Sequence, residues 1–559
     1  MKRFVKSFML ASLAVLLASC NCYNKMLKKV DRIDVSATPA VVTLKGNNAV
    51  TDIKVNFPAK YFNKRAVLKI TPVLVFEGGE IAGTPKFVQG EKVKDNYEVI
   101  SYKQGGSYTQ SVSIPYDKRA KISTLELRIE SKCSKNCGKK RKQFLPFAAI
   151  PVAEGVSTVQ LLADNAAYLT IMPDNFKRVT TITKDAEIMY QINRSNVRPG
   201  ELTKEQVKMF EDFVKEYSNK DRATLGNVYA KGYASPDGPV KFNDELSKKR
   251  SESGQEAIAK KLSSVNPKYD IAAYGEDWEG FKELVSASDI EDKDLILQVL
   301  AMQDNPVKRD EEIKSMTAVF EVLAKEILPQ LRRTKLIADV DIEGRTDAEI
   351  KEAAAKNIDV LSEEEMLYAA TLTDDNAAKL KAYEAAASKY NSVRGYNNAG
   401  VILAKEGKLA QAKAQLDKAA AMSKDAAITN NLGVVALMNG DLATAQKYLS
   451  ALNTADSKAN MGLVNLAEGN YAEAAKTLSG YDLAVAEVLN GNLSKAKSIL
   501  AGENSADADY LRAVIATKEG DMKTAGAQLK AAVAKDSALA KKASKDVNLK
   551  PLFKSGFKF

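Results

Sequence analysis

A short pattern recurs five times in the last third of this chain and requires paired helices there. In each copy a glycine is followed five residues later by an alanine and nine residues later by a leucine. The glycine can end a helix in a left-handed conformation, the alanine permits close helix approach, and the leucine fills the space between the helices. The copies are Gly407, Ala412, Leu416; Gly440, Ala445, Leu449; Gly469, Ala474, Leu478; Gly491, Ala496, Leu500; and Gly520, Ala525, Leu529. The sequence therefore predicts a stack of helical hairpins, an all-α solenoid.

This pattern resembles the tetratricopeptide repeat. The glycines lie 33, 29, 22 and 29 residues apart, against a usual period of about 34, so we expect an irregular superhelix. We assign residues 366–540 to the repeats, beginning with a helical pair over 366–390, and residues 541–559 to a C-terminal tail. The resemblance implies a concave groove that binds a segment of a protein partner. A purely structural spacer is the alternative.

The N-terminus has the pattern of a lipoprotein signal peptide. Lys2 and Arg3 precede an apolar run that ends in Leu-Ala-Ser before Cys20, too short for a comfortable membrane span. The sequence resembles the lipobox, which implies removal of residues 1–19 and acylation of Cys20. Asn21 favours the outer membrane, and no acidic cluster follows to suggest surface export, so we expect a lipid anchor on the periplasmic face. An ordinary secreted signal with a chance cysteine is the alternative.

Residues 20–32 read as a polar tether, and residues 33–180 read as a β-sandwich. In the latter, short alternating or β-branched runs are separated by glycine, proline and asparagine; Leu125, Leu127 and Ile129, for example, alternate with charged residues. Cys133 and Cys137 lie four residues apart in a basic loop. Because a secreted chain meets an oxidising compartment, we expect them to form a disulfide rather than a metal site.

Residues 232–250, GYASPDGPVKFNDELSKKR, organise the middle of the chain. Pro, Asp and Gly at 236–238 favour a turn, and Asn243 is expected to cap the following helix. Arg250 follows two helical turns later, on the same side, so that a helix N-terminus and a guanidinium could together hold a carboxylate. An ordinary surface arginine is the alternative reading of Arg250.

Gly232, Gly238, Asn243, Leu246, Ser247 and Arg250 have the spacing of the OmpA-like domain, which this stretch resembles. The resemblance covers residues 181–345 and implies an α/β domain of order β-α-β-α-β that holds peptidoglycan in the envelope of Gram-negative bacteria. Residues 278–330 are longer than the family segment and read as a two-helix insertion, and residues 346–365 read as a linker.

The same resemblance identifies a ligand site at Ser235, Asp237, Asn243 and Arg250. Ser235 stands where the family has an aspartate, so the acidic partner for the ammonium group of diaminopimelate is missing. Asp237, two residues later, is the candidate replacement. We therefore expect weak or absent peptidoglycan binding.

The chain contains no histidine, which excludes imidazole catalysis and the commonest metal ligand. Nucleophile-elbow, serine-lysine and phosphate-loop motifs are missing too. We therefore expect no enzyme, no catalytic residue, no metal, no cofactor and no nucleic-acid partner. The net charge of +11 comes from scattered lysines, with one cluster of basic residues at 132–142. This cluster either faces anionic lipid or forms a solvated hairpin tip.

Together these features predict a non-catalytic outer-membrane lipoprotein scaffold that joins the membrane to the cell wall or to envelope proteins. An accessory subunit of an outer-membrane secretion or assembly complex, whose OmpA-like domain no longer binds peptidoglycan, is the alternative.

Overall fold

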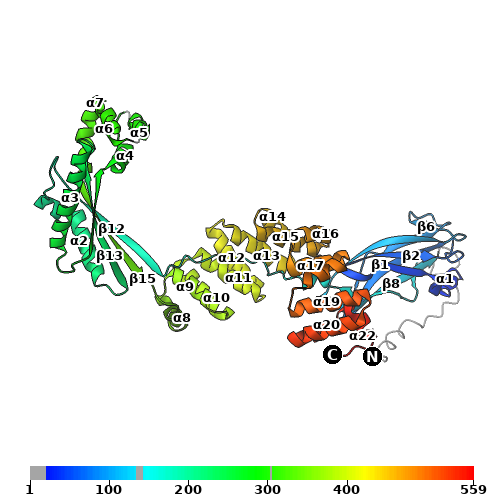
Figure 1. Ribbon diagram of the computed structural model, residues 1–559. Coiled ribbons are helices and arrows are strands. Elements are labelled where there is room, and N and C mark those ends of the chain that lie inside the picture. Colours follow the sequence, from blue (N-terminus) through cyan, green and yellow to red (C-terminus); the bar gives the residue numbers. More distant parts are fainter. Residues whose placement is uncertain (1–20, 134–142, 292, 303–304, 316) are drawn as a thin grey trace. The chain divides into compact units, whose positions relative to one another are not determined.

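The computed structural model describes residues 21–133, 143–291, 293–302, 305–315 and 317–559 (Figure 1). It divides into two compact units. The first consists of Met1–Pro173 and Thr373–Phe559, and the second of Asp174–Leu372. The sheet-rich N-terminal region and the C-terminal helices thus belong to one unit, from which the chain departs after Pro173 and to which it returns at Thr373.

Two sheets form the N-terminal part of the first unit, but their strands end at Ser157, short of the expected boundary at residue 180, and a 3-10 helix over Val159–Leu162 follows. One sheet has the order β11-β1-β2-β7 and the other β10-β8-β3-β5-β6, with β4 beside β3 and β9 beside β8. Residues of both sheets share one hydrophobic core, the arrangement of a sandwich. The strands are β1 (Asp34–Lys45), β2 (Asn48–Phe57), β3 (Ala66–Phe76), β4 (Gly79–Ala82), β5 (Lys86–Gly90), β6 (Glu98–Ile100), β7 (Gly106–Pro115), β8 (Ser123–Cys133), β9 (Leu145–Pro146), β10 (Ile150–Glu154) and β11 (Val156–Ser157).

The predicted disulfide between Cys133 and Cys137 is wrong. Cys133, the last residue of β8, is bonded instead to Cys22, with the two Cα atoms 6.3 Å apart. Cys137 lies outside the described residues. Cys22 belongs to helix α1 (Asn21–Leu27), whose Met26 is fully buried in the sandwich core. The expected polar tether is therefore a packed helix, and its burial brings a distant cysteine to the end of β8.

The second unit contains a four-stranded sheet with the order β12-β15-β13-β14. β13 and β14 are parallel, and β15 is antiparallel to both of its neighbours. Helices α2 (Glu205–Ser218) and α3 (Val240–Lys261) pack through Phe210 and Ile258 on the core that these strands share. The strands are β12 (Val179–Met189), β13 (Ala223–Ala234), β14 (Tyr269–Glu276) and β15 (Arg333–Glu343). The chain order, strand, helix, strand, helix, strand, is the one that the sequence predicts.

The insertion before β15 has the predicted bounds but more helices than the predicted pair. Its described part contains four helices: α4 (Trp278–Ala287), α5 (Lys293–Met302), α6 (Pro306–Ser315) and α7 (Thr317–Glu326). Phe281, Ile296 and Leu323 are buried in a core of their own. The insertion is thus a small helical cluster with its own packing.

The expected linker at 346–365 is also structured. It contains α8 (Asp347–Lys356) and the start of α9 (Glu363–Ala369), and both helices begin with a capping box. In α8, Thr346 caps the backbone N–H of Glu349, whose side chain bonds back to the N–H of Thr346. In α9, Ser362 and Glu365 repeat the arrangement.

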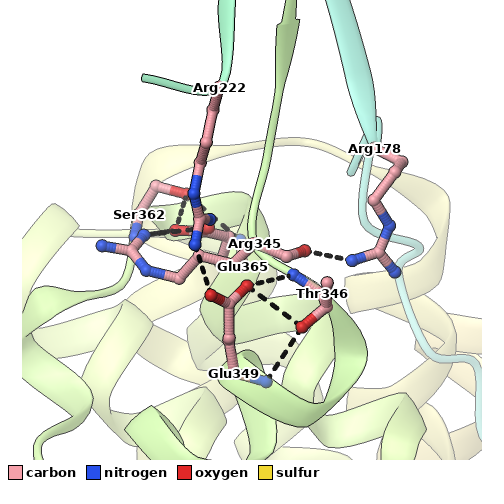
Figure 2. A network of polar contacts seen from close by, with 7 residues as sticks. All are labelled: Arg178, Arg222, Arg345, Thr346, Glu349, Ser362 and Glu365. Carbon is pink, nitrogen blue, oxygen red and sulfur yellow. Dashed lines mark hydrogen bonds and ion pairs between the residues drawn. The ribbon is translucent and has the colours of Figure 1, made fainter.

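Three arginines join these capping boxes to the strand ends (Figure 2). Arg222 pairs with Glu349, and Arg345 pairs with Glu365 at 2.8 Å, while Arg178 donates to the main-chain carbonyl of Arg345. The Thr346 N–H and the Arg222 guanidinium lower the pKa of Glu349 to about 2. Helices α8 and α9 are therefore fixed to the end of the sheet by charge-assisted bonds.

The predicted helical hairpins are confirmed (Figure 1). All five repeat glycines have positive φ, from +74° to +89°, as helix ends of this kind require. A Cβ atom on Gly400 would lie 2.7 Å from Leu416, which explains the small residue in the first helix of that pair. The helices are α10 (Asn376–Tyr390), α11 (Val393–Lys405), α12 (Leu409–Met422), α13 (Ala426–Met438), α14 (Leu442–Ser450), α15 (Ala455–Glu468), α16 (Tyr471–Thr477), α17 (Gly480–Asn490), α18 (Leu493–Leu500), α19 (Ala506–Glu519) and α20 (Met522–Lys535).

The last residues are not a free tail. Helices α21 (Ala538–Ala543) and α22 (Lys550–Lys554) follow the repeats, and Leu539, Leu549 and Leu552 are buried against them. Among the residues that the structure describes, no helix has both the length and the apolar character needed to cross a membrane.

Candidate functional site

A row of polar side chains lies along the first helices of the hairpins. Nine residues before the repeat glycine, four of the five copies carry an amide or a carboxyl group: Asn398, Asn431, Asn460 and Asp482. All four are at least 95% buried. Equivalent positions on stacked hairpins lie side by side, so these residues form a ladder, here called the asparagine ladder.

The asparagine ladder holds residues 164–172 of the same chain. Asn431 accepts the N–H of Thr170 through Oδ1 and donates through Nδ2 to the carbonyl of Thr170, both at 2.8 Å. Asn398 makes the same two bonds to Met172, again both at 2.8 Å. Each amide thus pairs with both main-chain groups of one residue, as a neighbouring β-strand would, and successive rungs contact every second residue of an extended segment.

The first three rungs are also connected through Asn397 and Asn430, the asparagines that precede two of them. Asn431 donates to Asn397 at 2.9 Å, and Asn460 donates to Asn430 at 2.9 Å. Asn430 also donates to the carbonyl of Tyr168 at 2.9 Å. Since buried amides are costly without partners, this network favours one arrangement of helices and segment together.

The third rung is incomplete. Asn460 donates to the carbonyl of Tyr168 at 3.2 Å, but its own Oδ1 is buried and has no hydrogen-bond partner among the described residues. The segment departs from a regular extended path here, because the N–H of Leu169 bonds to the carbonyl of Ala166. The internal segment therefore satisfies the ladder only in part.

The fourth rung is a carboxyl group. Asp482 accepts the backbone N–H of Asp164 at 2.9 Å. Burial raises the pKa of Asp482 to about 6. The N–H of Asp164 lowers this pKa, and the Asp164 carboxylate raises it further. At neutral pH this rung is a buried anion facing another acid.

We expect Asp482→Asn to stabilise the first unit at pH 7.5 by about 1 to 2 kcal/mol. The folded state binds the proton more tightly than the unfolded state, so the native chain loses stability as pH rises from about 4 to 6 and regains none above it. An asparagine side chain does not titrate, so the variant does not lose stability over this pH range. Thermal unfolding at pH 4.5 and 7.5 measures the difference, with exposed Asp374→Asn as the control. An equal effect at both pH values would contradict the titration argument.

The second unit brings Ser235 and Asp237 together, as the sequence predicts, but adds Arg332. Ser235 donates to Asp237 at 2.6 Å, and Arg332 donates to Ser235 and pairs with Asp237, both at 3.1 Å. Ser235 is 4% exposed. The Asp237 carboxylate therefore already has a cationic partner. Arg332 and Arg333 are adjacent where the last strand begins, and this pair is the sequence signal that could have identified Arg332.

Arg250 is not exposed, and its guanidinium group is not free to bind a ligand. It is 1% exposed, and its guanidinium donates to the main-chain carbonyls of Arg194, Tyr233 and Gln191 at 3.0, 2.9 and 3.2 Å. Burial lowers the pKa of Arg250 to about 10, so it stays charged at neutral pH. In this structure it fastens the loop after β12 to the end of β13.

Asn243 is not the helix cap that the sequence predicts. Helix α3 begins at Val240, with Pro239 at the N-cap position. The Asn243 side chain donates to the carbonyls of Ser235 and Gly238, both at 3.2 Å. It therefore holds the turn that carries Ser235 and Asp237.

A hollow of about 870 Å³ adjoins this cluster. It is lined by residues 189–194, Arg198, Pro329, Gln330 and Arg332. Arg250 does not line it; the arginines that do are Arg194, Arg198 and Arg332, of which Arg198 pairs with Glu201 and Arg332 with Asp237. No cluster of acidic, cysteine or histidine side chains fit to bind a metal occurs in the described ranges, and Cys20 lies outside them.

No protein-family model and no curated protein matches the chain. Among solved structures, one similar chain is a tetratricopeptide repeat protein from Parabacteroides merdae ATCC 43184, with 13% identity and a TM-score of 0.31 over 37% of this chain and 91% of that one. Another is YrrB, described as a TPR protein with an unusual peptide-binding site, with 21% identity and a TM-score of 0.19 over 36% of this chain and all of that one. Both are of the class that the glycine, alanine and leucine pattern resembles.

Proposed function

We propose that this chain is a non-catalytic scaffold that binds other proteins by holding an extended main-chain segment of the partner. The asparagine ladder carries the proposal. Asn398 and Asn431 each pair with the N–H and the carbonyl of one residue, and every polypeptide offers those groups at every second residue of an extended stretch. A site of this kind selects backbone conformation first and side chains second.

The groove is occupied by the chain itself, so a partner has to replace residues 164–172. The incomplete rung at Asn460 and the buried carboxyl group of Asp482 make the internal segment an imperfect ligand. A regular extended segment could supply an N–H to Asn460. Exchange between internal and external segments is then set by their difference in affinity.

A labelled peptide with the sequence of residues 164–172, DNAAYLTIM, tests this proposal in the full chain. The Thr170→Pro variant removes the N–H that Asn431 accepts, which weakens the internal competitor. We expect this variant to bind the peptide about tenfold or more tightly than the native chain by fluorescence anisotropy. The N–H of Ile171 makes no bond within the described chain, so Ile171→Pro is the matched control. Equal peptide binding by both proline variants would overturn the proposal.

We place the scaffold at the outer membrane, lipid-anchored at Cys20 and facing the periplasm, on the strength of the lipobox resemblance. Cys20→Ala is expected to abolish incorporation of labelled fatty acid and to release the protein from the membrane fraction. Cys137→Ala is the control for loss of a cysteine. Unchanged labelling and membrane retention in Cys20→Ala would refute the anchor.

We further propose that the second unit is an OmpA-like domain, supported by the spacing of its motif and the order of its strands and helices. Its site lacks the family aspartate, and Asp237 is neutralised by Arg332. We expect weak sedimentation of the native chain with purified sacculi, and a tenfold to hundredfold gain for Ser235→Asp, the size of one charge-assisted hydrogen bond at about 1.5–3 kcal/mol. Ser235→Asn is the uncharged control. Tight native binding that Ser235→Asp leaves unchanged would contradict the charge argument.

The same neutralised pair favours the second candidate function, an accessory subunit of an outer-membrane secretion or assembly complex. In that role the cluster of Ser235, Asp237 and Arg332 is structural. Absence of sacculus binding by both the native chain and Ser235→Asp, together with a stable co-purifying envelope complex, would support it over the cell-wall scaffold.

A further inference from the structure

A second cavity lies within the first unit, where the sandwich meets the C-terminal helices. Its volume is about 330 Å³, at the small end of the range for sites that bind small molecules. One wall comes from the start of β8 and the turn between β10 and β11, and the other from α22 and the residues before it. The residues that line it are Lys121, Ile122, Ser123, Glu154, Gly155, Ser544, Lys545, Asp546, Val547, Lys550 and Phe553.

The cations of this cavity are not all neutralised. Glu154 pairs with Lys550 at 2.5 Å and lies 3.7 Å from Lys554. Lys121 and Lys545, in contrast, have no ion pair in the described part of the chain. Burial lowers the pKa of Lys121, and the pull of Asp546 opposes this effect only in part.

Asp546 attracts Lys121 but forms no ion pair with it, and neutral donors already bond to the Asp546 carboxylate. It accepts the Tyr510 hydroxyl at 2.8 Å, and the backbone N–H and side-chain amide of Asn548 at 2.9 and 2.8 Å. A half-buried ammonium group without a carboxylate in contact is costly, so the site is built to receive a negative charge.

An unused hydroxyl group lies on the same wall. The Oγ atom of Ser123, two residues after Lys121, is buried and has no hydrogen-bond partner within the described residues. Native structures leave few such atoms unpaired. A donor beside a cation is the usual arrangement for holding a carboxylate or phosphate oxygen.

The rest of the lining is apolar. Ile122 is 57% exposed although it is a large aliphatic residue, and Val547 and Phe553 face the same space from the other wall. A ligand with a hydrocarbon part would remove this surface from water at about 25 cal/mol per Å².

We propose that this cavity binds a small amphipathic anion, with its carboxylate or phosphate at Lys121 and Ser123 and its hydrocarbon chain against Ile122 and Phe553. The ligand adds to the contacts that already join the sandwich and the C-terminal helices, among them Lys550–Glu154 and a hydrogen bond of 3.1 Å from Ser157 to Asn548. Occupancy therefore also stabilises the first unit.

Isothermal titration of the full chain with octanoate, octyl phosphate and octanol tests the proposal. We expect one saturable site for at least one of the two anions, with octanol at least about tenfold weaker because it lacks the charge. The better of the two anions distinguishes a carboxylate from a phosphate ligand. Absence of saturable binding by both anions, or octanol binding as tightly as they do, would overturn the proposal.

Two lysines of the same short segment provide matched variants. Lys121→Gln is expected to weaken binding of the anion about tenfold or more, whereas Lys118→Gln, exposed and outside the cavity, should leave it unchanged. Lys545→Gln is an independent exposed variant if Lys121→Gln fails to fold. Unaltered affinity in a folded Lys121→Gln, or in Lys545→Gln when the former is unfolded, would refute the site.

Discussion

Cys22→Ser is expected to lower the free energy of unfolding of the first unit by about 2 to 5 kcal/mol. The bond to Cys133 closes a segment with a sequence separation of 111 residues, and a loop of about 100 residues is worth roughly 4.7 kcal/mol in the chain-entropy description. Urea unfolding followed by far-ultraviolet circular dichroism measures the loss. Reduction of the native chain should produce a loss of the same size.

The chain offers two internal controls. Its single tryptophan, Trp278, lies in the second unit, so tryptophan fluorescence should report an unchanged transition. Cys137→Ser should leave the first unit as stable as the native chain. A loss in Cys137→Ser as large as that in Cys22→Ser would mean that Cys133 pairs with Cys137 after all.

This disulfide also changes the expectation for the N-terminus. The hydroxyl of Tyr23 donates to the carbonyl of Pro146 at 2.6 Å, and Met26 is fully buried. Cys20, the proposed lipid site, precedes Cys22 by only two residues. The polar character of residues 20–32 predicts a tether, yet a few buried side chains and one covalent bond suffice to fix so short a helix.

The repeats were predictable because their sequence pattern follows from contacts within a single helical hairpin. A positive φ at Gly407 and contact between Gly400 and Leu416 are set within one hairpin, so their spacing appears directly in the sequence. The ladder left a signal as well, since Asn398, Asn431 and Asn460 lie at one offset from the glycine. The occupant of the groove was not predictable, because the bonds from these asparagines to the segment span 226 to 292 residues.

The cluster in the second unit was predictable only for neighbours in sequence. Ser235 and Asp237 lie in one turn, so the motif brings them together. Arg332 reaches them from 95 and 97 residues away, and Arg250 is buried because the loop at 191–194 folds over it. Side-chain roles that depend on which strand ends meet cannot be deduced from spacing along one helix.

Thr170→Pro is expected to destabilise the first unit by about 2 to 4 kcal/mol. Proline has no N–H, so the bond to Asn431 is lost, and the buried Oδ1 of Asn431 keeps only a long bond of 3.5 Å from Asn430, at a cost of about 1–3 kcal/mol. Urea unfolding by circular dichroism measures the loss, with Trp278 fluorescence as the control for the second unit.

Two matched variants separate the backbone bond from other effects of the substitution. Ile171→Pro imposes the same ring one residue later, where the N–H has no partner within the described chain and the side chain is 38% exposed, so it should cost less than about 1 kcal/mol. Thr170→Ala keeps the N–H and loses the two hydroxyl bonds, one donated to Asp456 at 3.0 Å and one accepted from Asn430 at 3.2 Å, worth about 1 kcal/mol each. If all three variants lose equal stability, the segment is held by side-chain packing, and the ladder does not recognise the main chain.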